Sequence, residues 1–278
     1  MRVIESFICG KENNPVTCED GIFISDNLVV VIDGVTAKGN RLWDGHKSGC
    51  FAKDLLLDYL RRSIEKCDED FAFAELGAVT LLAKLDAVLH DEVAARCGND
   101  LPAEEYPRAS IIIYNDATKE VISYGDCQCR INDEVHSHVK KIDVLNSDLR
   151  AYYLEYHLLQ GMTLAELAEN DLGRAAIQEN LLMQFAFENK CGEFGYPVLN
   201  GMGIEPSLIK IYKVLPGDEV ILASDGYPIL GSSLEESEEM LQQVLQEDPM
   251  CFRKYRSTKG IKAGNVSFDD RVFCRIIV

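Results

Sequence analysis

The chain has 278 residues, of which 47% are hydrophobic and 27% are charged, a balance typical of a globular protein with a substantial core. Its formal net charge of −18 argues against non-specific binding to nucleic acid or to an anionic membrane surface. No apolar run is long enough to span a membrane. Because no secretory signal is recognisable, we interpret the ten cysteines as reduced thiols and expect a cytoplasmic protein.

The chain begins with three predicted strands, at residues 1–8, 22–24 and 28–32. The turn signal Asp26-Asn27 joins the last two strands into a hairpin. The third strand is apolar and mostly β-branched, so we expect it to be buried. A polar loop then leads to two helices, predicted at residues 47–65 and 71–96 because their apolar residues recur at helical spacing.

The middle of the chain is rich in strands and is then interrupted by helices. Strands joined by hairpin-like turns are predicted at residues 110–114, 120–124, 128–131 and 135–139. The next block has almost no strand signal, and we expect helices at residues 149–159, 164–169 and 174–188. We interpret residues 143–203 as a helical insertion, because the block is short and β-structure resumes after it.

The last part of the chain contains three further predicted strands, at residues 207–214, 219–223 and 271–278. A helix is predicted at residues 234–246, and residues 251–264, rich in Lys and Arg, are expected to form a loop or a frayed helix. Strands joined by short loops require antiparallel pairing, and two blocks of helix can cover sheet faces. The order of elements therefore predicts a single α+β domain over residues 1–278, an antiparallel β-sandwich with helices packed outside.

Acidic residues recur where the predicted strands begin or end. They follow three strands and precede the last one, at Asp33, Asp126, Asp225 and Asp269. An Asp-Gly pair after a strand is usually only a turn, although it is also a common place to hold a metal or phosphate. The repetition indicates one shared acidic centre. Glu19 and Asp20 could contribute to it, because the predicted hairpin places them across the sheet from Asp33.

Carboxylates are the ligands that Mg²⁺ and Mn²⁺ prefer. The sequence predicts a two-metal site to which carboxylates and one backbone carbonyl contribute, from Asp33, Asp225, Asp269 and Gly34. A water that bridges two such ions loses a proton readily and can attack a phosphoryl group. Motifs for other chemistry are absent from the sequence: Cys/His clusters at zinc spacing, G-x-S-x-G elbows and G-x-x-x-x-G-K-[ST] loops.

Five short acidic motifs follow one another along the chain: Cys18-Glu19-Asp20, Val31-Ile32-Asp33-Gly34, Tyr124-Gly125-Asp126-Cys127, Leu222-Ala223-Ser224-Asp225-Gly226 and Asp269-Asp270-Arg271-Val272. In this order they resemble the motifs of the metal-dependent PP2C (PPM) protein phosphatases, over nearly the whole chain. The resemblance implies a four-layer α/β/β/α sandwich, with the insertion as the family's variable flap. It also implies hydrolysis of phosphoserine and phosphothreonine in a phosphoprotein substrate by a metal-bridging water.

The resemblance further implies a ligand set for two Mn²⁺ or Mg²⁺ ions. Asp33 would bridge both ions, and the carbonyl of Gly34 would bind one of them. Asp225 and Asp269 would complete the shell of one ion, and Asp33 and Asp225 would act in catalysis through the metal-bound water that attacks.

Three other acids take supporting roles in the same comparison. Asp20, with Glu19 nearby, would orient metal-bound waters without contacting an ion itself. Asp126 matches the position that helps to hold a third, weaker ion in bacterial members of the family.

Two features of the family are replaced here. Val35 occupies the position of the His that is thought to protonate the leaving group, which makes His46 the candidate general acid by proximity in the loop. A lone loop His is more often a surface residue. Pro15 replaces a phosphate-binding Arg, and three basic residues could compensate for it: Lys11, Lys38 and Arg41.

Two alternatives remain open on these grounds. A PP2C-like domain without the His and the Arg could be a catalytically impaired binding or regulatory domain. The stretch that ends at Asp33 also faintly resembles the aspartyl nucleophile of haloacid-dehalogenase-type phosphatases, which act on small molecules. Those enzymes have a second acid two residues later, where this chain has Val35, and the antiparallel order of strands disagrees with them.

Overall fold

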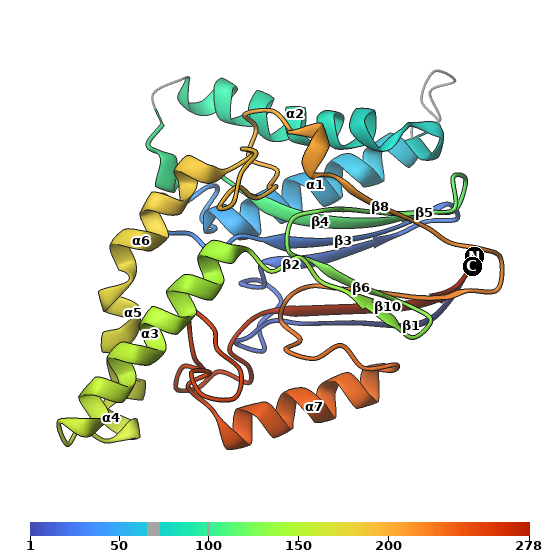
Figure 1. The fold of residues 1–278 in the computed structure, drawn as a ribbon. Helices are drawn as coiled ribbons and strands as arrows, with labels where there is room; N and C mark the ends of the chain where they lie inside the picture. Colours follow the sequence, from blue (N-terminus) through green and yellow to red (C-terminus); the bar gives the residue numbers. More distant parts are fainter. Residues whose placement is uncertain (66–72, 99–100) are drawn as a thin grey trace.

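The computed structural model describes residues 1–65, 73–98 and 101–278, whose strands form two five-stranded antiparallel sheets (Figure 1). The first sheet has the order β2-β3-β4-β5-β8, with strands β2 (Asp20–Ile24), β3 (Leu28–Gly34), β4 (Ala109–Asn115), β5 (Glu120–Tyr124) and β8 (Lys210–Lys213). The second has the order β1-β10-β9-β6-β7, with strands β1 (Arg2–Cys9), β6 (Gln128–Ile131), β7 (Glu134–His136), β9 (Glu219–Ala223) and β10 (Arg271–Ile277).

Helices cover the outer face of each sheet. The first sheet is covered by α1 (Ser48–Glu65) and α2 (Ala78–Cys97), and the second by α7 (Leu234–Glu247) (Figure 1). This arrangement confirms the expected α/β/β/α sandwich, and it contradicts the parallel sheet of an aspartyl-nucleophile phosphatase. Within the described residues, no helix combines the length and apolar character needed to cross a membrane.

The helical insertion lies at one end of the two sheets (Figure 1). It contains four helices, α3 (Lys141–Leu159), α4 (Leu164–Glu169), α5 (Leu172–Ala176) and α6 (Gln178–Met183). The helix α3 is longer than predicted, and the predicted helix 174–188 is broken. Ile177, between α5 and α6, has φ of −97° and ψ of 3°, which is outside the α-helical range.

Two other boundaries differ from the predictions. The second predicted helix, 71–96, begins at Ala78 because Gly77 before it is extended, with ψ of 152°. Residues 71 and 72 lie outside the described part of the chain. The predicted strand 207–214 is shorter, because Pro206 begins a 3₁₀ turn and the strand β8 starts only at Lys210.

The sequence of the strand β3 is continuously apolar and does not alternate with polar residues, because both of its faces are buried. Val29 and Val31 pack between the two sheets, whereas Val30 and Ile32 pack under α1 and α2. Successive side chains point to opposite faces of a strand, and both faces of this one are covered. All four side chains are fully buried, so β3 is fixed on both sides up to the point where the site begins.

The strand register brings several strand ends to one edge of the sandwich. Asp33 pairs with Asp20 on one side and with Ser110 on the other, at the end of β3. In the second sheet, Ala223 at the end of β9 pairs with Phe273 near the start of β10. The loops that leave these strands therefore meet beside the helical insertion.

Candidate metal centre

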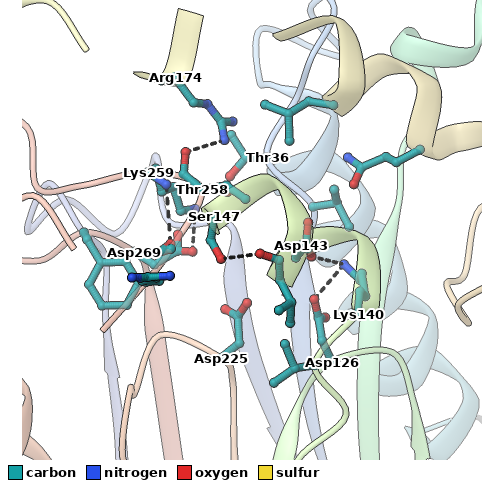
Figure 2. Close-up of a pocket in the computed structure, with 18 of the residues that line it drawn as sticks. Thr36, Asp126, Lys140, Asp143, Ser147, Arg174, Asp225, Thr258, Lys259 and Asp269 are labelled. Carbon is teal, nitrogen blue, oxygen red and sulfur yellow. Dashed lines mark hydrogen bonds and ion pairs between the residues drawn. The ribbon is translucent and has the colours of Figure 1, made fainter. Parts of the chain in front are cut away.

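Three aspartates meet where these loops converge. Asp33 ends β3, Asp126 lies between β5 and β6, and Asp225 follows β9. One carboxylate oxygen from each lies within 4.8 Å of the other two, and all three residues are half-buried. They line a cavity of about 180 Å³, which we call the central cavity (Figure 2). The sandwich thus converts three acids that are far apart in sequence into one candidate metal centre.

Two glycines beside these acids allow the backbone to pass close to neighbouring residues, and this close approach positions Asp126 and Asp225. Gly125 has φ of +131°, and a Cβ atom there would lie 2.4 Å from the Ser110 side chain. This approach puts Asp126 beside Ser110, whose hydroxyl donates a hydrogen bond to Asp126 Oδ1. A Cβ atom on Gly226 would lie 2.0 Å from the backbone oxygen of Asp270, so the turn after β9 also requires glycine.

Asp33 and Asp225 have the least compensated carboxylates of the three. Within the described residues, neither side chain accepts a hydrogen bond or forms an ion pair; Figure 2 shows Asp225 without an interaction. Burial raises the pKa of both groups well above the usual range, and the neighbouring carboxylates raise it further. A divalent cation between them would stabilise the two buried negative charges and offset the repulsion between the carboxylates.

Asp126 and Asp269, in contrast, are paired with lysines (Figure 2). Lys140 Nζ lies 2.6 Å from Asp126 Oδ2, and the ammonium of Lys259 contacts Asp269 Oδ2. Burial opposes ionisation of both acids, but the attraction of the ammonium groups outweighs it and lowers each pKa. Asp269 lines the central cavity but does not belong to the group of three carboxylates.

Glu19 and Asp20 are fully buried and do not line the central cavity, and each has an oxygen without a hydrogen-bond partner among the described residues. Lys11 Nζ lies 2.8 Å from Glu19 Oε2 and from Asp270 Oδ2, so it is tied to acids and does not compensate for the replaced Arg. Glu19 Oε1 and Asp20 Oδ2 accept no hydrogen bond from the described residues. Burial and the nearby Asp270 raise the pKa of Asp20.

Gly34 and His46, also singled out from the sequence, do not line the central cavity either. Gly34 is buried, and a Cβ atom on Gly49 would lie 2.8 Å from the Gly34 carbonyl oxygen, so that carbonyl faces the start of α1. His46 lines an adjoining, larger cavity of about 870 Å³, which shares Arg174 and Lys259 with the central cavity, and its Nδ1 lies 3.8 Å from the Sγ of Cys50. The structure therefore does not bring His46 to the acids, and among the described residues no histidine lines the central cavity.

Five basic residues line the central cavity, and the sequence suggested only one of them, Lys38, for this site. The other four are Lys140, Arg174, Arg256 and Lys259. Arg41, also considered, instead has its guanidinium 4.8 Å above the ring of Trp43. The basic composition of the loop 251–264 is a sequence signal for Arg256 and Lys259, but it says nothing about where their side chains point. No sequence pattern singled out Lys140 or Arg174 for the site.

Lys38 and Arg174 differ from the other three because neither forms an ion pair with an acid among the described residues, whereas Lys140, Arg256 and Lys259 each do. Arg174, from α5, donates from Nη1 to the Thr258 carbonyl at 2.8 Å, and no ion pair involves it within the described residues (Figure 2). Lys38 Nζ donates to the Thr36 carbonyl at 2.9 Å. Burial, together with the nearby Arg174, lowers the pKa of Lys38 from 10.5 to about 7.

No family model matches the sequence, and no curated protein matches it in sequence. The structure is similar to the serine/threonine phosphatase PstP/Ppp of Mycobacterium tuberculosis over 100% of this chain and 99% of that chain, with a TM-score of 0.51 and 13% identity. The chain has the PP2C phosphatase fold. A variant of a bacterial serine phosphatase is also similar, over 99% of this chain and 96% of that one, with a TM-score of 0.50 and 15% identity. The PP2C fold expected from the acidic motifs is thus confirmed.

Proposed function

We propose that this protein is a divalent-metal-dependent phosphatase that removes phosphate from phosphoserine or phosphothreonine in proteins. The observation that carries the proposal is the meeting of Asp33, Asp126 and Asp225 in one cavity. Two of these carboxylates have no partner within the described residues. The PP2C fold supports the reaction class, because the similar structures are serine or serine/threonine phosphatases.

The donor set fits Mn²⁺ or Mg²⁺, as the acidic motifs led us to expect for two or three such ions. Every candidate ligand is an oxygen, and carboxylates predominate, which suits hard divalent cations. The buried oxygens Glu19 Oε1 and Asp20 Oδ2, which lack partners, suit water molecules around an ion. A bound cation would polarise a phosphoryl oxygen and lower the pKa of a water molecule.

Arg174 is suited to bind the phosphoryl group of the substrate. Its guanidinium lines the same cavity, and no acid neutralises it within the described part of the chain. Guanidinium groups bind phosphate oxygens with two parallel hydrogen bonds, which also fixes the orientation of the group. Arg174 would thus replace the family's Arg at the position of Pro15, from the helical insertion instead of the first loop.

The proposal is tested by hydrolysis of para-nitrophenyl phosphate and of a phosphoserine peptide with Mn²⁺, Mg²⁺ or EDTA. We expect turnover that requires metal and falls by at least about 100-fold in Asp33→Asn and Asp225→Asn, the size of effect expected when a charge-stabilising group is lost. Asp26→Asn, in an exposed turn, is the matched control.

Two other results would support the alternatives. Turnover that survives Asp225→Asn, with a phosphorylated aspartate trapped, would indicate an aspartyl nucleophile. Mn²⁺ binding without any turnover would indicate a catalytically impaired binding domain. The latter remains the second candidate, because no histidine lines the central cavity among the described residues.

A further inference from the structure

Hydrolysis of a serine or threonine phosphate requires a proton for the departing oxygen. The alkoxide is a strong base and a poor leaving group, and a positioned acid accelerates such a step by about 10²- to 10⁴-fold. Asp33 and Asp225 cannot provide this proton while they hold a cation. Val35 lines the cavity without a donor, and His46 lines only the adjoining larger cavity.

Lys38 is the lysine in this cavity whose protons are least committed. It lies in the loop between β3 and α1, is half-buried and lines the central cavity with Asp33 and Asp225. Its Nζ donates one hydrogen bond, to the Thr36 carbonyl, and within the described chain no carboxylate lies at ion-pair distance. In contrast, the ammonium groups of Lys140 and Lys259 are held by Asp126 and Asp269.

We propose that Lys38 is the general acid of the reaction, an inference that rests on the proposed phosphatase function. A water oxygen forms the new bond to phosphorus, and the bond from phosphorus to the seryl or threonyl oxygen breaks. The departing oxygen takes a proton from Lys38 Nζ, which leaves the alcohol and a neutral amine. The proton released by the attacking water returns the amine to its charged form, so the cycle needs no further reactant.

The surroundings of Lys38 favour proton donation near neutral pH. Burial, together with the cations Arg174 of α5 and Lys259 of the loop after α7, lowers its pKa to about 7. Two acids oppose this effect, Asp143 of α3 and Glu19 before β2. A donor whose pKa lies near the working pH is present in its acid form and also gives up its proton readily.

Two substrates and three variants test the proposal. The first substrate is a phosphoserine peptide, whose leaving oxygen needs a proton. The second is para-nitrophenyl phosphate, whose leaving group is stable as an anion. The metal-loaded full chain is compared with Lys38→Met, which removes the acid, and with Lys38→Arg, which keeps the positive charge but does not donate a proton near neutral pH. Lys47→Met, which removes an exposed lysine from the same loop, is the control.

We expect both Lys38 variants to lose about 100-fold or more in kcat on the peptide and at most about 10-fold on para-nitrophenyl phosphate. In the original protein, kcat on the peptide should fall as the pH rises above about 7, the pKa of Lys38. Equal losses on both substrates, or restoration of peptide turnover by Lys38→Arg, would overturn the role of Lys38 and leave the phosphatase function intact. Absence of metal-dependent turnover of either substrate by the original protein would overturn both.

Discussion

Asp20 lies directly opposite Asp33 in the antiparallel pair formed by β2 and β3. Opposed like charges on neighbouring strands destabilise a sheet, and here one of the two residues is fully buried. Burial raises the pKa of both carboxyl groups; the nearby Asp270 raises that of Asp20 further, and Asp20 raises that of Asp33 further. The sheet therefore tolerates an unfavourable pair at the edge of the cavity, and a bound cation would compensate for it.

The first prediction concerns the stability of the protein without metal. The pKa of Asp33 is higher in the folded chain than in the unfolded chain, so the folded state binds more protons and loses stability as the pH rises above 3.8. We expect Asp33→Asn in EDTA to raise the melting temperature at pH 7 by about 3–8 °C, since 1 kcal/mol corresponds to about 2–4 °C. The gain should shrink as the pH approaches 4.

Calorimetry with and without Mn²⁺ measures this effect. Mn²⁺ should stabilise the original protein and should stabilise Asp33→Asn much less, because a ligand stabilises only the state that binds it. Asp26→Asn, in the exposed turn between β2 and β3, should change neither value. A lower melting temperature for Asp33→Asn in EDTA would contradict the inferred repulsion.

The second prediction concerns binding of the substrate phosphate. Arg174→Ala should raise KM for a phosphoserine peptide by about 10- to 100-fold, because a hydrogen bond to a charged group contributes about 1.5–3 kcal/mol. The fall in kcat should be much smaller. Arg253→Ala, which removes an exposed Arg paired with Glu155, provides the control and should leave KM unchanged. A loss confined to kcat would mean that Arg174 does not bind the ground state of the substrate.

The third prediction concerns the stability cost of the Lys38 charge. Because its pKa is about 7 in the folded chain and 10.5 when unperturbed, the unfolded state binds more protons between these values. The charge destabilises the fold fully below pH 7, and this penalty disappears as the pH rises towards 10.5. We therefore expect Lys38→Met to raise the melting temperature by about 3–8 °C at pH 6. The gain should be small at pH 10, and a gain independent of pH would contradict the prediction.

The fourth prediction concerns Arg150, which is completely buried and connects α3 to the loop that carries Lys259. Its Nη2 lies 2.7 Å from Asp171 Oδ2, and its guanidinium donates to three backbone carbonyls, those of Met250, Cys251 and Ser257. Arg150→Met leaves these acceptors without their donor, so we expect a loss of about 3–5 kcal/mol in the free energy of unfolding. Urea denaturation measures this loss.

An exposed ion pair nearby provides the comparison for Arg150. Arg256→Met breaks the contact of Arg256 with Asp148, in which both side chains are about half exposed, and should cost less than about 1 kcal/mol. Similar losses for the two variants would mean that the Arg150 network is not a main support of the loop.

The sequence by itself determined the layers of the fold and the identity of the acids. Apolar alternation and turn signals are local properties, so the strands around Asp33, Ser110 and Ala223 were predicted correctly in position and in antiparallel order. The predicted helix boundaries were wrong where the backbone conformation of a single residue determines where a helix begins or ends, as at Gly77 and Ile177. Asp33, Asp126 and Asp225 could be named in advance because each follows a strand and the strands of one sandwich end together.

Only the tertiary structure decided which of the acids remain available to a cation. Lys140 pairs with Asp126 and Lys259 with Asp269, whereas Arg174 and Lys38 face the same cavity without acidic partners. These cations come from the helical insertion and from loops, whose side chains are positioned by packing against distant parts of the chain. A sequence shows which residues are charged but not where their side chains point, because packing against distant parts of the chain determines that orientation. For this reason the candidate metal ligands could be named from strand ends, but the groups that we propose to bind phosphate and to donate the proton could not be assigned these roles.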